Sequence, residues 1–169
     1  PLGMQMSLRR RIELLEWAKE NDAWVIEDDY AGELQLEGRA APALASIDDA
    51  GRVIHIGTFS KTIGPRIRLG YLVVPKSAFA RCMEVAANLN PAGSTVTQRA
   101  VSDFMERGHY LRHLRRVKRL YQKRKRLVVE HFANTGRDVS VEAEGALSIR
   151  MMLPNHVNDV SIAAALGKD

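Results

Sequence analysis

Short apolar runs separated by helix-like segments constrain the fold of this chain most. Three runs, Ala23–Ile26, Arg52–Ile56 and Leu69–Val74, contain β-branched residues and have the length of buried strands. The segment that follows Ser7 has apolar residues at a spacing near 3.6, which predicts a helix capped by that serine. This order of helix and strands predicts an α/β fold with a mainly parallel sheet.

The remainder of the chain is predicted to be mostly helical, with a smaller second unit at its end. Helices are expected at Ser77–Leu89, at Thr97–Arg107 and from His109 to about Phe132, and strands at Val139–Val141 and Ala146–Leu153, with a last helix at Asp159–Leu166. The helix from His109 has an apolar stripe along one side. We therefore predict two units, one over residues 1–132 and the start of a smaller α+β unit over 133–169.

Size and composition narrow the class of protein. The chain has 169 residues, enough for one domain or slightly more. It has no apolar run of eighteen residues and no secretory leader pattern, so neither a membrane span nor export is expected. Cys82 is the single cysteine, which excludes an internal disulfide framework and fits a reducing cytoplasm. No Cys/His cluster has zinc-ligand spacing.

Chemically active side chains follow the ends of the predicted strands. Asp28 lies just past the first run, and Tyr30 follows two residues later. Lys61 lies in a polar loop between the second and third runs, with Thr58 and Ser60 before it; Arg68 ends the loop. Ligands of open α/β sheets bind outside the carboxyl ends of the strands. A lysine in a loop between two buried strands is a poor packing residue, but it can hold a carbonyl cofactor as an imine.

These residues match the needs of pyridoxal 5′-phosphate. The cofactor requires an amine for its aldehyde, an acid for its pyridine nitrogen, a hydroxyl for its phenolic oxygen, and cations and donors for its phosphate. Candidates are, in that order, Lys61, Asp28, Tyr30, and Arg68 with Thr58 and Ser60. Each residue alone has a commoner structural role, as a solvated charge or a turn former. The hypothesis rests on their joint pattern.

Two other functions have partial support in the sequence. The run Gly57–Thr62 contains a Lys-Thr pair as in a phosphate-binding P-loop, but Ser60 stands where that motif has a glycine, so a P-loop is rejected. The basic segment from Arg112 to Arg126 carries much of the net charge of +5 and could bind nucleic acid. Its apolar stripe favours a packed helix with a solvated basic face instead.

The motifs also carry a family resemblance. Glu27-Asp28-Asp29-Tyr30, Gly57-Thr58-Phe59-Ser60-Lys61-Thr62 and Arg68-Leu69-Gly70-Tyr71 resemble fold-type I aminotransferases of class I/II. The long-helix segment from Gly108 to Arg124 is similar to that of the MocR/GabR group, bacterial regulators in which a winged helix-turn-helix domain is fused to an aminotransferase-like domain. The resemblance covers nearly the whole chain.

The resemblance implies a role for each site residue. Lys61 would hold pyridoxal phosphate as a Schiff base, Asp28 would pair with the pyridine nitrogen, and Tyr30 would meet the phenolic oxygen. Arg68 and Thr58 would meet the phosphate. Which acid would pair with the pyridine nitrogen is open. Many aminotransferases place the tyrosine three residues after this acid, which points to Glu27, whereas the MocR-like pattern points to Asp28. Asp29 is the third candidate.

A fold-type I subunit has roughly twice this length, so the resemblance implies a fragment: the second half of the large domain and the start of the small one. It implies an effector-sensing domain of a bacterial regulator that binds an amino compound, reaches DNA only through a domain outside this chain, and is a cytoplasmic homodimer when whole. The alternative is a catalytic aminotransferase, for example of the 2-aminoadipate type. No metal is expected.

Overall fold

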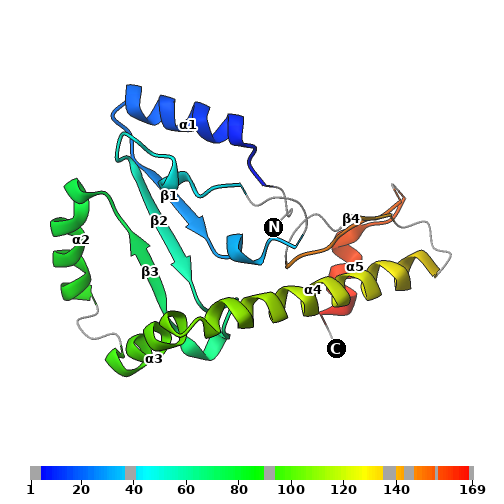
Figure 1. Cartoon of the computed structure of the whole chain (residues 1–169). Helices are drawn as coiled ribbons and strands as arrows, with labels where there is room; N and C mark the ends of the chain where they lie inside the picture. The colour runs from blue at the N-terminus through cyan, green and yellow to red at the C-terminus, as the bar shows by residue number, and fades with distance from the viewer. Residues whose placement is uncertain are drawn as a thin grey trace.

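The computed structural model describes residues 5–36, 41–89, 94–134, 140–142, 147–154 and 156–167. Its helices are α1 (Leu8–Glu20), α2 (Lys76–Leu89), α3 (Thr95–Glu106), α4 (His109–Asn134) and α5 (Asp159–Leu166). Its strands are β1 (Val25–Asp29), β2 (Val53–Thr58), β3 (Gly70–Val73), β4 (Ser140–Glu142) and β5 (Arg150–Met152). Each predicted helix and strand has a counterpart in this α/β arrangement (Figure 1). Predicted segments at 90–93, 135–139 and 143–146 lie outside the described residues.

The main sheet has the order β1-β2-β3. Strands β1 and β2 are parallel, as predicted, but β3 runs antiparallel to β2. The reason is the short link between them: residues 59–69 contain only turns and a 3-10 helix at Pro65–Ile67, whereas a parallel return needs a longer crossover. Strand β1 also ends later than predicted, so Asp28 lies inside the strand and not just past its end.

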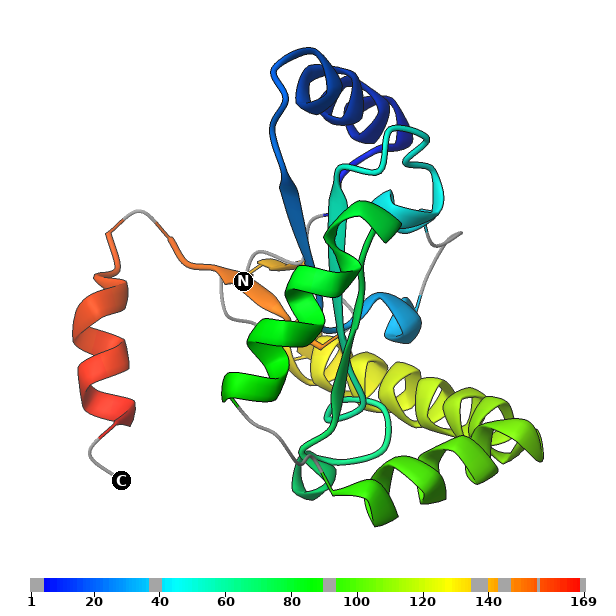
Figure 2. The same ribbon diagram turned by 90° about the vertical axis from the view of Figure 1, so that its left-hand side faces the viewer.

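Helix α1 begins where the sequence indicated. The Ser7 side chain accepts a hydrogen bond from the Arg10 N–H group at 3.4 Å, and Asn21 ends the helix. The helix packs near the start of the strands, with Ala18 fully buried (Figure 2). Its Arg11 guanidinium reaches β1 and forms an ion pair with Glu27 at 3.0 Å. The helix is thereby fixed to one face of the sheet.

Helix α4 crosses the end of the sheet where β1 and β2 finish (Figure 1). A core cluster of Phe59, Val101 and Tyr110 joins the end of β2, α3 and the start of α4. Gly108 separates the two helices with φ of 68°, a left-handed conformation that glycine adopts at no steric cost. The predicted apolar stripe of α4 is only partly covered: Leu111 and Leu127 are both more than half exposed.

Beyond α4, β4 and β5 form an antiparallel pair, and α4 contacts β4. Helix α5 stands apart from the main sheet (Figure 2). Among the described residues, no helix has both the length and the apolar character needed to cross a membrane.

Candidate functional site

The loop that carries Lys61 is compact. The Ile63 and Gly64 N–H groups both donate to the Phe59 carbonyl oxygen, at 2.8 and 3.3 Å, and close the turn around Lys61. Phe59 is buried, whereas Lys61 is exposed and its side chain has no hydrogen bond or ion pair to another described residue. The amine is therefore available on a loop with an ordered backbone.

Asp28 and Thr58 lie on the same face of the sheet. Asp28 pairs with Ile56 across the parallel ladder, and Thr58 follows two residues later on β2. Cross-strand partners and residues two apart on a strand share a face. This face is open: Ile26, two residues before Asp28, is 67% exposed, and Leu72, opposite Ile56, is 55% exposed. The Asp28 carboxylate has no hydrogen bond or ion pair among the described residues.

Glu27 lies on the opposite face and is fully engaged. Its carboxylate accepts hydrogen bonds from the Leu44 and Ala45 N–H groups, at 2.8 and 3.4 Å. It also pairs with Arg11 at 3.0 Å and contacts the His55 Nδ1 atom at 2.9 Å. Burial alone would raise the pKa of Glu27, but these hydrogen bonds outweigh it and lower the pKa. Glu27 thus has a structural role, joining β1, β2, α1 and the segment at Leu44.

Asp29 and Tyr30, which follow Asp28, differ in whether their side chains have partners. The Asp29 carboxylate accepts a hydrogen bond from the Gly32 N–H group at 2.6 Å and so fixes the turn after β1. Tyr30 is about half exposed, with no described partner for its hydroxyl. Of the three candidate acids for the pyridine nitrogen, Glu27, Asp28 and Asp29, only Asp28 has an unengaged carboxylate in the described structure.

Arg68 has an uncommon backbone conformation. It follows the 3-10 helix Pro65–Ile67 with φ of 46° and ψ of 41°, in the left-handed region that non-glycine residues rarely adopt. Its side chain is exposed and lies just before β3. Strained positions of this kind cluster at functional sites, where the surrounding structure holds them in place.

Thr58 and Ser60 support the start of the Lys61 loop. The Ser60 N–H group donates to Thr58 Oγ1 at 3.1 Å, so the threonine hydroxyl fixes the turn. A cavity of about 340 Å³ lies between this loop and α4; its walls include Lys61, His113, Tyr121 and Arg124. Asp28 lines a different cavity, of about 440 Å³. The structure therefore brings Asp28 and Thr58 to one face, while Lys61 opens on the α4 side of the loop.

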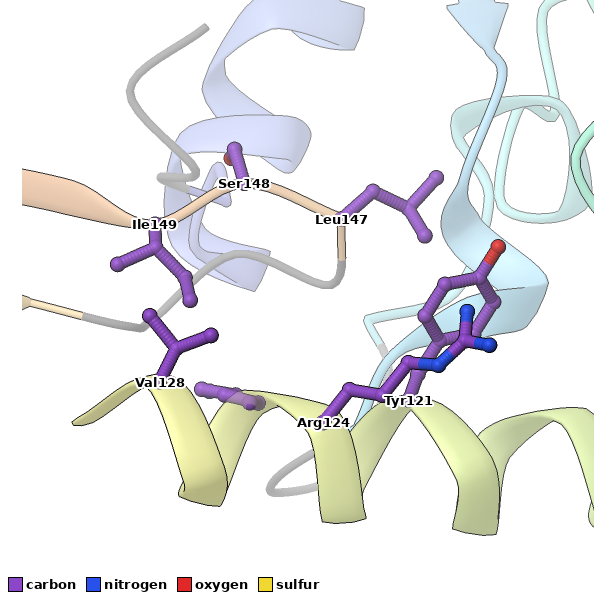
Figure 3. Close-up of a pocket in the computed structure, with 7 residues that line it drawn as sticks. Tyr121, Arg124, Val128, Leu147, Ser148 and Ile149 are labelled. Carbon is purple, nitrogen blue, oxygen red and sulfur yellow. The ribbon is translucent and has the colours of Figure 1, made fainter. Parts of the chain in front are cut away.

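A second, smaller cavity continues along α4. Its volume is about 160 Å³, and Figure 3 shows its wall, in which Val128 of α4 faces Ile149. Tyr121 and Arg124 line both this cavity and the one at Lys61. The two hollows are thus neighbours on the same helix face, and the second lies against the segment that leads into β5.

Sequence patterns did not indicate the hydrogen-bonded cluster behind Lys61, which is centred on the buried residues Tyr110 and Thr62. The Tyr110 hydroxyl donates to the Glu33 carboxylate and lies 3.1 Å from Thr62 Oγ1. The His113 Nε2 atom lies 2.8 Å from the Thr62 carbonyl oxygen. Burial, followed by the hydrogen bond to Glu33, raises the pKa of Tyr110 well above its ordinary value. Only the spacing of two polar residues on the apolar side of a helix could have pointed to it.

Known transcriptional regulators are similar to this chain in sequence. The chain is 40% identical over 129 residues to the probable rhizopine catabolism regulatory protein MocR of Rhizobium meliloti, covering 76% of this chain and 26% of that protein. It is 33% identical over 169 residues to the HTH-type transcriptional regulator TauR of Rhodobacter capsulatus, covering 98% of this chain and 34% of that protein. The chain thus spans about a quarter to a third of the length of these relatives.

Solved structures show the same fold. A kynurenine aminotransferase from Pyrococcus horikoshii, in complex with PMP and substrates, matches 99% of this chain and 42% of its own with a TM-score of 0.85 and 29% identity. The α-aminoadipate aminotransferase LysN from Thermus thermophilus, complexed with N-(5'-phosphopyridoxyl)-L-leucine, matches 99% of this chain and 44% of its own with a TM-score of 0.84 and 24% identity. The fold is therefore that of the fold-type I pyridoxal-phosphate transferases.

The sequence profile described as "Aminotransferase class I and II" matches residues 1–166, almost the entire chain. The solved aminotransferases named above share its fold. The chain belongs to the aminotransferase class I and II family.

Proposed function

We propose that this chain is part of the effector-sensing domain of a bacterial transcriptional regulator, in which Lys61 holds pyridoxal 5′-phosphate covalently. The regulators among its relatives, including one of pyridoxine biosynthesis in Corynebacterium glutamicum at 34% identity over 128 residues, support this reading over a purely catalytic one. The observation that carries the cofactor site is the unengaged Asp28 carboxylate, set between two acids that are both engaged.

The donor set of this chain fits the cofactor that the family implies. Asp28 would hold a proton on the pyridine nitrogen, because an anionic carboxylate stabilises the cationic ring. Tyr30 would donate to the phenolic oxygen, and Arg68 with Thr58 and Ser60 would bind the phosphate. When bound, the cofactor supplies an electron sink for chemistry at an amine carbon. The strained backbone of Arg68 supports its assignment, because the fold holds that side chain at a cost.

The remaining parts of the proposal concern the whole protein. We propose that residues 1–132 belong to the large domain and 133–169 to the start of the small one. The protein would act in the cytoplasm as a homodimer, bind an amino compound at Lys61, and reach DNA through a domain outside this chain. Binding of the amine in place of Lys61 would shift the balance between two forms of the regulator.

The test uses the full-length protein loaded with pyridoxal phosphate. Borohydride reduction followed by peptide mass mapping should place the cofactor mass on Lys61, and Lys61→Ala should carry no label. A label on another lysine would overturn the assignment. Regulation is tested separately: a primary amine that displaces Lys61 should change the affinity of the protein for its own promoter DNA at fixed salt concentration.

Catalysis is the alternative. The chain is 29% identical over 162 residues to an aromatic-amino-acid aminotransferase of Thermococcus litoralis, and the solved neighbours named above are aminotransferases. Steady turnover of an amino acid and a 2-oxo acid by the loaded protein, with DNA affinity unchanged by amines, would favour this function over regulation.

A further inference from the structure

The residue after Lys61 is held through both its backbone and its side chain. Thr62 is only 4% exposed, although Lys61 beside it is exposed. Its carbonyl oxygen and its hydroxyl are both contacted from α4, by His113 and Tyr110. A carbonyl oxygen can only accept, so the Nε2 atom of His113 must carry a proton here. The loop is thus tied to α4 through both its backbone and a side chain.

Tyr110 extends this connection to β1. Its hydroxyl contacts Thr62 and donates to Glu33, in the 3-10 helix that follows β1. Tyr110 is 3% exposed, and its ring packs against Phe59, with centroids 5.9 Å apart. Tyr110 and Thr62 are the buried members of this network, and their hydrogen bonds favour one geometry, because a buried polar group without a partner is costly. The segments that follow β1 and β2, which carry the site residues, therefore meet at one point on α4.

We propose that Tyr110 and His113 are positioning residues for Lys61, which fix the lysine loop to the start of α4. The inference rests on the proposed role of Lys61. The Lys61 amine would compete with external amines for the aldehyde of pyridoxal phosphate. Because the fold holds it in place, it would do so at a high effective concentration, and this concentration falls when the loop is less well held. Removing the contact from His113 therefore favours any external amine that competes with Lys61.

The experiment titrates the full-length, cofactor-loaded protein with methylamine and measures the fraction of cofactor that borohydride traps on Lys61. His113→Leu should lower the methylamine concentration needed for half-displacement by about tenfold, a loss of effective concentration. His113→Gln, which keeps an N–H donor, should restore much of the wild-type value. His109→Leu is the control, because His109 is exposed on the same helix and contacts only Arg112 and Phe104 in the described structure.

The melting temperature of the cofactor-free protein separates positioning from stability. A purely structural role would lower this temperature in His113→Leu and leave the half-displacement concentration unchanged, which would overturn the inference. Should that variant fail to fold, Tyr110→Phe, which removes one hydroxyl, should lower the half-displacement concentration about threefold. No shift in that variant would also overturn it. If wild-type Lys61 takes no label, the proposed function fails instead.

Discussion

Glu27 and Asp28 are consecutive residues of β1, and their carboxylates lie on opposite faces of the sheet. The first is held by α1, His55 and the backbone at Leu44 and Ala45; the second has no described partner and faces the open side. A one-residue step in a strand thus separates a structural acid from an available one, because successive side chains of a strand point to opposite faces.

This separation predicts different effects for neighbouring acid-to-amide changes. Asp28→Asn should weaken retention of pyridoxal phosphate by at least tenfold, because the amide cannot stabilise a protonated ring nitrogen. Asp29→Asn is the matched control: its remaining Oδ1 atom can still accept from the Gly32 N–H group. Dialysis against cofactor-free buffer, followed by absorbance, measures the retention. Equal losses in both variants would mean that the register of the acid is wrong.

Glu27 should make the stability of the fold depend on acid pH. Its folded-state pKa is lowered, so its contribution is present above the ordinary value of 4.5 and is lost as pH falls below it. In Glu27→Gln the free energy of unfolding should drop by about 2 kcal/mol at pH 7, and the difference from wild type should shrink below pH 4.5. Urea unfolding at several pH values provides the measurement. A constant difference across pH would contradict the charged role of Glu27.

Tyr110 should have the opposite dependence, at alkaline pH. Because its folded-state pKa is raised, the unfolded chain ionises first, near pH 10, and stability falls as pH increases beyond that point. Tyr110→Phe should cost about 1 kcal/mol at pH 7 through the lost hydrogen bonds, and should lose less stability than wild type above pH 10. Thermal unfolding at pH 7 and above pH 10 compares the two. Parallel losses would show that another group causes the alkaline effect.

Gly57 allows a close approach between two strands. A Cβ atom at this position would lie 2.1 Å from the ring of Tyr71, which pairs with it on β3. Gly57→Ala should therefore cost about 1–3 kcal/mol, because the ring must move off its present position. Chemical denaturation measures the loss. Tyr71→Leu in the same background should recover part of it, and a Gly57→Ala variant of unchanged stability would show that the ring moves without cost.

Arg68 should show a conflict between stability and binding. Glycine adopts its left-handed conformation without the penalty of about 1 kcal/mol that other residues incur. Arg68→Gly should thus keep or raise the melting temperature of the cofactor-free protein while it weakens retention of pyridoxal phosphate. Arg66→Gly is the control, since Arg66 is exposed in the adjacent 3-10 helix. Equal retention in both variants would remove Arg68 from the phosphate site.

Much of the fold was predictable from local patterns. The helix after Ser7 and the long helix from His109 follow from capping and apolar spacing, and the runs around Val25, Val53 and Leu72 follow from short β-branched segments. The direction of β3 was not, because pairing depends on the length and shape of the link. The end of β1 was also missed, since Asp28 and Asp29 disfavour a strand by themselves but are held in the ladder by β2.

By itself the sequence determined the parts of the candidate site: a lysine in a polar loop, an acid near a strand end and an arginine before the next strand. Side-chain chemistry and local periodicity follow directly from the order of residues, so these three candidates could be predicted from the sequence. Only the tertiary structure decided which acid is engaged and what holds the lysine loop. Glu27 is engaged by Arg11 and Leu44, and Thr62 by Tyr110 and His113, residues 16 to 51 positions apart. Such contacts depend on which faces of the helices and strands meet in the folded chain, and local sequence patterns do not predict this.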